Sequence, residues 1–236
     1  MKVAVLNYSG SVGKTIVASH LLAPRMNHAP IFAVETTNET AADLGLDIDQ
    51  LRGEQFGKLF RDLLRLHDAI VDVGASNIED FLSAMTRYEG AYEEIDFFVL
   101  PVIGTGKAQR ETIKTITALA NLGVAPERIR VLFNRVQSDV VEEFLPVLTY
   151  AKKTEEFVAN AKALIYENEV FELLADVRTS IADVLSDQTD YRSLLRQADQ
   201  SDTARITHLT NRHALRALAK PVDRQLNSAF TALFEE

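Results

Sequence analysis

Short apolar runs alternate along this chain with longer stretches in which apolar residues recur at helical spacing. The alternation is typical of a parallel β-sheet with helices on both faces, so we expect an α/β fold with a mostly parallel, twisted sheet. The strands are predicted at Lys2–Leu6, Ile31–Glu35, Ala69–Val73, Phe97–Val102, Ile129–Asn134 and Ala163–Tyr166. The helices are predicted between them at Lys14–Leu22, Gln55–Leu66, Asn77–Tyr88, Ala108–Leu122 and Val140–Asn160.

No strand-like run follows Tyr166, and the remaining pattern predicts helices to the C-terminus. We expect Pro221 to separate the last two helices, because proline has no amide hydrogen to donate within a helix. No stretch rich in Gly, Ser or Pro marks a linker. The chain is therefore expected to form one domain, residues 1–236, with an α/β core to about residue 188 and C-terminal helices over about 189–236.

Composition narrows the classes of function. The chain has 25 basic and 34 acidic residues, a net charge of −9, which argues against coating nucleic acid by bulk charge but permits a local basic patch. The absence of cysteine excludes disulfides, thiolate catalysis and cysteine-ligated metals. The five histidines have no metal-ligand spacing. No apolar run reaches the length of a membrane span. Because a chain without cysteine suits a reducing compartment, we expect a cytoplasmic protein.

The most informative segment joins the first strand to the first helix. Residues 7–15, here called the phosphate loop, read Asn-Tyr-Ser-Gly-Ser-Val-Gly-Lys-Thr. Amide groups at a helix start point outward and the helix dipole favours an anion, so this order forms a phosphate cradle. We expect Lys14 to bridge the β- and γ-phosphates and the Thr15 hydroxyl to hold Mg²⁺. The backbone amides expected to bind phosphate are those of Gly10, Ser11, Val12 and Gly13.

The loop departs from the usual P-loop at one position. The eight-residue pattern would have glycine at position 8, where this chain has Tyr8. What remains is Gly-Ser-Val-Gly-Lys-Thr between a strand and a helix. This context favours phosphate binding over the alternative, a glycine turn before a helix capped by threonine.

Asp72 lies near the end of a predicted buried strand. A carboxylate at this place can hold a metal-bound water beside the phosphates. The alternative is that Asp72 caps the helix expected from Asn77. With Lys14 and Thr15 upstream, the magnesium role is favoured.

The phosphate loop followed by the strand that carries Ile70-Val71-Asp72 near its end resembles the ParA/MinD group of P-loop ATPases with a deviant Walker A loop, and within it the StbB-like plasmid-stability proteins. The resemblance also covers Val99–Val102, Val131–Arg135 and Ser180–Val184. It implies a P-loop NTPase fold, ATP or ADP with Mg²⁺, a nucleotide-dependent homodimer, and a role in plasmid maintenance, partition or positioning through a DNA-binding adaptor protein. It also assigns Asn134 to adenine recognition and favours ATP over GTP, whereas Asn134 taken alone is equally a turn residue.

Two positions depart from the pattern of this family. Ser9 stands where its members have a lysine that reaches the phosphates of the opposite subunit, and Thr37 replaces an aspartate linked to water positioning, while Glu35 keeps a carboxylate. Such cations contribute ~10³–10⁵ in rate. We therefore expect Lys14 and Asp72 to support nucleotide binding with slow hydrolysis. The alternatives are a nucleotide-stabilised binding module without hydrolysis, and a small-molecule phosphotransfer or ligase enzyme of the same fold.

The C-terminal region carries a local positive charge. Arg212, Arg216 and Lys220 recur every four residues and would form one basic stripe on a helix. The stripe could contact DNA phosphates directly, although a solvated helix face is the favoured interpretation.

The last helix is expected to be amphipathic. Leu226, Phe230, Leu233 and Phe234 share one face, and the segment ends in two acidic residues. Anionic lipid would repel those acids. We therefore expect this face to pack on the protein or a partner rather than on a membrane.

Overall fold

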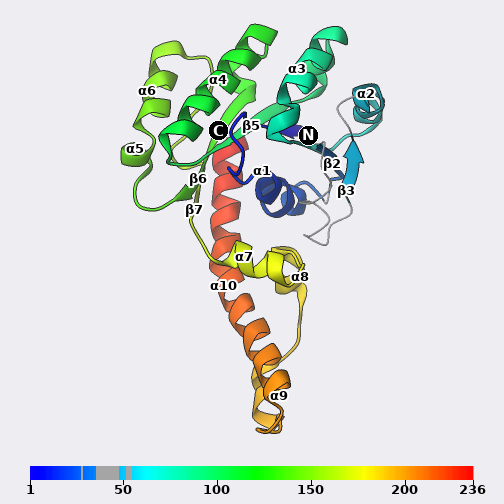
Figure 1. Ribbon diagram of the computed structural model, residues 1–236, viewed down its shortest axis with the longest axis vertical. Helices are drawn as coiled ribbons and strands as arrows, with labels where there is room; N and C mark the ends of the chain where they lie inside the picture. The colour runs from blue at the N-terminus through cyan, green and yellow to red at the C-terminus, as the bar shows by residue number, and fades with distance from the viewer. Residues whose placement is uncertain (28, 36–47, 52–54, 236) are drawn as a thin grey trace.

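The computed structural model describes residues 1–27, 29–35, 48–51 and 55–235. Within these ranges, seven strands form one parallel sheet ordered β3-β2-β4-β1-β5-β6-β7 (Figure 1). The strand order reverses at β1, and ligands of open α/β sheets bind beyond the carboxyl ends of the strands at such a point. The bounds are β1 Lys2–Val5, β2 Ile31–Val34, β3 Ile48–Leu51, β4 Ala69–Val73, β5 Phe97–Val102, β6 Ile129–Val136 and β7 Leu164–Tyr166.

Helices cover both faces of the sheet. One face is covered by α2 Phe56–Arg65, α3 Ile78–Arg87, α4 Gly106–Leu122, α5 Val140–Glu143 and α6 Leu145–Thr154. The other face is covered by α1 Lys14–Ile16 with its π-helical continuation η1 Val17–Leu22 and the 3₁₀ turn η2 Ala23–Arg25, by α7 Val170–Asp176 and α8 Ile181–Ser186, and by the second half of α10 Thr203–Phe234.

The period-two alternation of the central strand divides its side chains between these two layers. Val3 and Val5 pack with the layer of η1 and α10, whereas Ala4 and Leu6 pack with the layer of α2, α3 and α4. All four side chains are fully buried. Burial on both faces explains why these strands are continuous apolar runs in the sequence.

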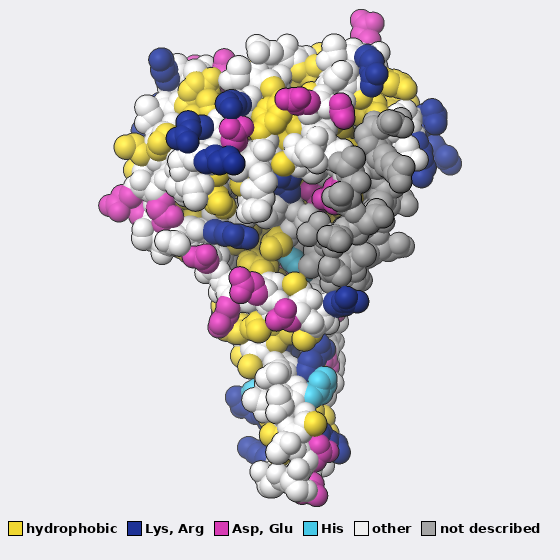
Figure 2. Space-filling view, in the orientation of Figure 1, with side chains coloured by type: hydrophobic (Ala, Val, Ile, Leu, Met, Phe, Trp, Pro, Cys, Tyr) yellow, Lys and Arg dark blue, Asp and Glu magenta, His cyan; other side chains and the backbone are white. Residues whose placement is uncertain are grey.

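A helical stalk, formed by α9 Tyr191–Gln197 and residues 203–218 of α10, projects from the α/β body (Figures 1 and 2). Its small core consists of Tyr191, Ala198 and Leu209. Beyond the stalk, α10 continues along the face of the sheet that η1 also covers, where Leu226 and Leu233 are buried. The ring centroids of Phe234 and Phe97 lie 5.1 Å apart. The expected packing of this last face on the protein is confirmed. Within the described ranges, no helix combines the length and apolar character that crossing a bilayer requires.

Two expectations from the sequence are wrong in detail, and one strand was not expected. Pro221 does not separate two helices, because α10 runs through it without a break. The helix predicted at Val140–Asn160 is two helices, α5 and α6, which meet at Phe144, and the second ends where Glu155 adopts a positive φ of 56°. Strand β3 was not predicted, because its Ile-Asp-Gln-Leu sequence is not an apolar run.

Candidate functional site

The phosphate loop is fixed from below by buried hydrogen bonds of Asn7. The Asn7 amide nitrogen donates to the carbonyl oxygen of Pro101 at 2.9 Å and to the hydroxyl of Thr112 at 2.6 Å, and its side-chain oxygen accepts from the amide of Ser9 at 2.9 Å. The amide of Tyr8 donates to the Thr115 hydroxyl at 3.1 Å. The first two residues of the phosphate loop are thereby bonded to β5 and α4.

Gly13 and Asn134 meet where the loop turns into α1. Gly13 has a φ of +86°, and a Cβ added to it would lie 2.5 Å from the side-chain nitrogen of Asn134. That nitrogen donates to the carbonyl oxygen of Val12 at 2.8 Å. Both the left-handed backbone and the close approach therefore require glycine. Asn134 is a buried residue within β6 and not a turn residue, and its adenine role stays a prediction.

Lys14 is buried beneath the loop with its ammonium held by loop carbonyls. The Nζ atom donates to the carbonyl oxygens of Ser9 at 3.0 Å and Asn7 at 3.3 Å. Burial lowers the pKa of Lys14, and the nearby carboxylates of Asp72 and Glu35 oppose this shift. The charge is thus placed inside the curve of the loop, where a bound phosphate group could replace the two carbonyls as its partner.

Thr15 and Asp72 form the second part of the site. The Thr15 hydroxyl donates to Oδ2 of Asp72 at 2.7 Å. Neither residue serves as a helix cap, because Gly13 is the N-cap of α1, Asn77 that of α3, and neither cap position receives a side-chain hydrogen bond. The alternatives based on capping are therefore wrong.

The Asp72 carboxylate is almost completely buried. Burial raises its pKa to about 6; the Thr15 hydrogen bond and Lys14 lower it, and Glu35 raises it. Its Oδ1 atom has no hydrogen-bond partner within the described part of the chain. A carboxylate oxygen left this way beside a hydroxyl fits Mg²⁺, which takes few protein ligands and keeps waters and phosphate oxygens around it. No cluster of three His, Cys, Asp or Glu side chains suited to a metal is present among the described residues.

The remaining residues predicted for the site lie in the phosphate loop or outside the residues that the structure describes. Gly10 and Ser11 are exposed at the top of the loop, with Ser11 at a φ of +56°, and Val12 is buried beneath it. Ser9 is buried, and its hydroxyl donates to the carbonyl oxygen of Gly10 at 3.3 Å. Thr37 lies outside the described residues.

The basic stripe lies on α10, well apart from the phosphate loop in the sequence and in Figure 1. Its three members differ in their contacts. Arg212 donates to the Asp187 carboxylate at 3.3 Å and to the Tyr191 hydroxyl at 3.2 Å, so its charge is paired within the protein. Arg216 and Lys220 line a groove between α10 and residues 188–192.

Sequence reasoning missed the supports of the loop. It gave no role to Asn7, Thr112 or Thr115. One signal for the two threonines exists, because they fall on the same helical face as the buried Ile116 and Leu119. Polar residues on the buried face of a helix need partners, and these two find them in the phosphate loop.

No protein-family model matches the sequence, and neither does any curated protein. Solved structures do match. MinD from Aquifex aeolicus, a cell division protein, aligns over 93% of this chain and 95% of its own with 14% identity and a TM-score of 0.54. MinD from Pyrococcus horikoshii, a septum site-determining protein complexed with Mg-ADP, aligns over 95% of this chain and 96% of its own with 13% identity and a TM-score of 0.50.

A third solved structure is apo McdA from Cyanothece, which aligns over 78% of this chain and 92% of its own with 13% identity and a TM-score of 0.52. These structural alignments establish the architecture of the chain, whereas sequence identities this low leave its activity open. The parallel sheet with its covering helices and the C-terminal helix agree with these solved structures. The chain therefore has the fold of the ParA/MinD-type P-loop ATPases.

Proposed function

We propose that the chain is a nucleotide-dependent switch that binds ATP or ADP with Mg²⁺ and hydrolyses ATP slowly. The observation that carries this proposal is the meeting of the Lys14 ammonium, the Thr15 hydroxyl and the Asp72 carboxylate at the point where the strand order reverses. The Mg-ADP complex of the P. horikoshii MinD, which has the same fold, supports the same class of ligand.

Each part of the site would have one task. The amides of residues 10–13 bind phosphate oxygens, and Lys14 exchanges its loop carbonyls for the β- and γ-phosphates. Thr15 and Oδ1 of Asp72, which has no hydrogen-bond partner among the described residues, hold the metal and its water. The Mg²⁺ ion supplies charge neutralisation of the phosphates when it is bound. For Asn134 to recognise adenine, its amide has to leave the Val12 carbonyl.

Slow hydrolysis follows from position 9. The Ser9 side chain is small, buried and bonded to its own loop, so it has neither the charge nor the reach to stabilise a phosphate of a second subunit. We infer a rate well below that of P-loop enzymes that carry such a cation, which contributes ~10³–10⁵ in rate. Hydrolysis at several turnovers per second that is abolished by Lys14→Ala would contradict this inference.

Dimerisation and the biological role rest on the resemblance to the ParA/MinD group. We propose a homodimer whose formation depends on nucleotide, working in the cytoplasm in plasmid maintenance, partition or positioning through a DNA-binding adaptor. Direct DNA contact through the basic stripe would rely on Arg216 and Lys220, since Arg212 is paired with Asp187.

The decisive experiment is calorimetry of ATP, ADP and GTP with the wild type and Lys14→Ala, together with sedimentation of the same samples. We expect adenine nucleotides to bind the wild type in the presence of Mg²⁺ and to favour the dimer, and Lys14→Ala to lose both effects. The matched control is Lys107→Ala, an exposed lysine on α4, which should bind normally. Absence of binding at millimolar ATP and ADP would refute the nucleotide site itself.

A second candidate is a nucleotide-stabilised binding module that does not hydrolyse ATP. The burial of Ser9 in its own loop favours it. Phosphate release measured with and without DNA separates the two functions. Release that stays at the level of Lys14→Ala under every condition, while nucleotide still binds, would select the binding module.

A further inference from the structure

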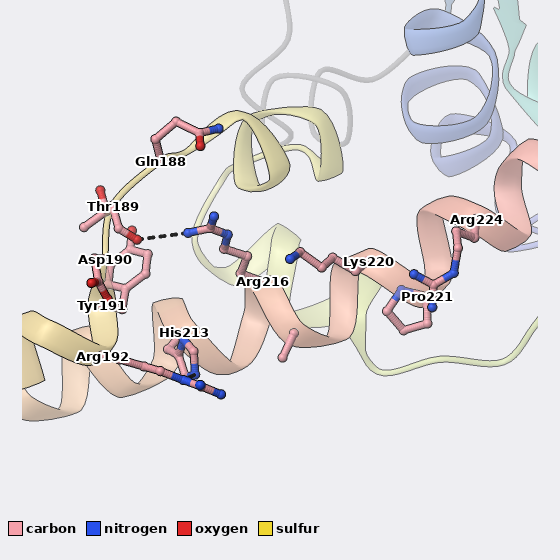
Figure 3. A pocket seen from close by; sticks show the side chains of 11 residues that line it. Gln188, Thr189, Asp190, Tyr191, Arg192, His213, Arg216, Lys220, Pro221 and Arg224 are labelled. Atoms are coloured by element: carbon pink, nitrogen blue, oxygen red, sulfur yellow. Dashed lines mark hydrogen bonds between the residues drawn. The ribbon is translucent and has the colours of Figure 1, made fainter.

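A groove lies at the base of the stalk, between α10 and the segment that joins α8 to α9 (Figure 3). Its volume is about 780 Å³, within the range of roughly 300–1,000 Å³ typical of small-molecule sites. The groove belongs to neither the phosphate loop nor the sheet. Its walls are residues 188–192 on one side and the turns of α10 from His213 to Arg224 on the other.

The groove is strongly positive in a chain that is negative overall. Among the described residues that line it, four carry a positive charge and one a negative charge: Arg192, Arg216, Lys220 and Arg224 against Asp190. Hydrogen bonds from the side chain and backbone of Ser193 lower the pKa of Asp190 and keep it ionised. A net charge of about +3 within one groove repels itself unless an anion binds there.

Arg216 is held by a hydrogen bond across the groove, whereas Lys220 and Arg224 are exposed to a ligand. One guanidinium nitrogen of Arg216 donates to the carbonyl oxygen of Thr189 at 2.9 Å, which spans the groove and leaves its other donors for a ligand (Figure 3). Lys220 and Arg224 are exposed, and the described part of the chain provides them with no ion pair. Arg212, one turn away, shows the contrast, because its charge is neutralised by Asp187.

The shape of the groove indicates a compact ligand. Arg216, Lys220 and Arg224 follow each other every four residues on one helix, so the three lie within about 12 Å along its axis. A stiff, convex duplex would meet only the rim of this hollow. Two or three linked phosphate groups carry enough negative charge to neutralise these cations, and guanidinium groups bind phosphate with two parallel hydrogen bonds.

We propose that this groove is a second anion site, which binds a small molecule carrying two or three phosphate groups. The site is independent of the phosphate loop and of the function proposed for it. Its basis is the groove lined by Arg192, Arg216, Lys220 and Arg224, which face one carboxylate, that of Asp190, among the described lining residues.

The test uses inorganic tripolyphosphate as the probe and the Lys14→Ala protein as the background, so that the phosphate loop does not contribute. Calorimetry should detect one site in this background. Adding Lys220→Ala and Arg224→Ala should weaken binding by about tenfold or more, because two charge-assisted contacts are lost. Both side chains are exposed, so the fold should be retained, which circular dichroism verifies.

The control replaces Lys152 and Lys153, two exposed lysines on α6, by alanine. It removes the same net charge and should leave tripolyphosphate binding within about twofold. Equal weakening in both double variants, or no binding in the Lys14→Ala background, overturns the proposal. So does a DNA duplex that binds through Lys220 and Arg224 while tripolyphosphate does not, because the groove would then be a nucleic-acid surface.

Discussion

The guanidinium of Arg25 lies 2.6 Å from the carboxylate of Asp223 and joins the end of the helix that starts at the phosphate loop to the middle of α10. The same group donates to the carbonyl oxygen of His20 at 2.9 Å and to the side-chain oxygen of Asn227 at 2.7 Å. The Arg25 side chain is only 9% exposed. This cluster connects the candidate nucleotide site with the helix that carries the stalk.

Replacing Arg25 by alanine should lower the free energy of unfolding by about 2–3 kcal/mol, because a mostly buried charge pair and several hydrogen bonds to carbonyl groups are lost together. Urea denaturation measures the change. The comparison variant is Lys114→Ala, whose pair with Glu111 leaves the lysine 67% exposed and should contribute less than about 0.5 kcal/mol. Similar losses in the two variants would show that the Arg25 cluster is not a structural connection.

Gly13→Ala should destabilise the protein by about 2–4 kcal/mol. The positive φ penalises any side chain, and the new Cβ would have to displace the Asn134 amide from the Val12 carbonyl. Gly10→Ala is the matched control in the same loop, because its Cβ would meet no atom within 4 Å. Denaturant unfolding of both variants checks the prediction, and an equal effect at the two positions would contradict it.

Asn7→Ala should lower the free energy of unfolding by about 2–3 kcal/mol, since it leaves the Pro101 carbonyl and the Ser9 amide without their buried partner. It should also weaken nucleotide binding, because the start of the phosphate loop loses the hydrogen bonds of the Asn7 side chain to Pro101 on β5 and Thr112 on α4. Asn121→Ala, at an exposed position on α4, is expected to change neither property. Unchanged stability of Asn7→Ala would show that the loop does not need this support.

His20 predicts a specific loss of stability in mild acid. Burial lowers the pKa of His20 from 6.5 to about 4, and the carboxylate of Asp183 on α8 opposes the shift. The unfolded chain therefore binds a proton between these two values while the folded chain does not, and stability falls as the pH drops through this window. The expected contribution is about 2 kcal/mol between pH 7.5 and pH 5.

The measurement is urea denaturation of the wild type and His20→Leu at both pH values. Both nitrogens of His20 are buried without a partner in the described part of the chain, so leucine should be tolerated at neutral pH. His20→Leu should lose less stability on acidification than the wild type. The same acid sensitivity in both proteins would assign it to other groups.

The sequence predicted the strands best where both faces are buried. Strands such as Lys2–Val5 and Ala69–Val73 are apolar at every position but one each, and this pattern has few alternatives between two layers of helices. The order of strand, glycine loop and helix also predicted Lys14 and Thr15 as site residues, and Asp72 was predicted from its place near the end of a buried strand. These residues are brought together by the parallel register of β1 and β4, which pairs Val5 with Asp72.

Tertiary contacts decided what the sequence did not predict. The rule that proline ends a helix was outweighed at Pro221, because a buried stripe continues through it at steps of four and three residues and Pro221 itself is exposed. The members of this stripe are Leu215, Ala219, Val222, Leu226, Ala229 and Leu233. The contact of Asn134 with the loop joins residues 122 positions apart, and no local pattern indicates it.

Because α10 is continuous, a small movement at one end of it produces a larger movement at the other. One end of this helix packs against the sheet, and the other end packs against α9. From Ala219 to Thr203 the helix is about 24 Å long, so a tilt of about 10° at Ala219 would move the end at Thr203 by about 4 Å. A displacement of a fraction of an ångström near Asp223 would thus be magnified severalfold at the far tip.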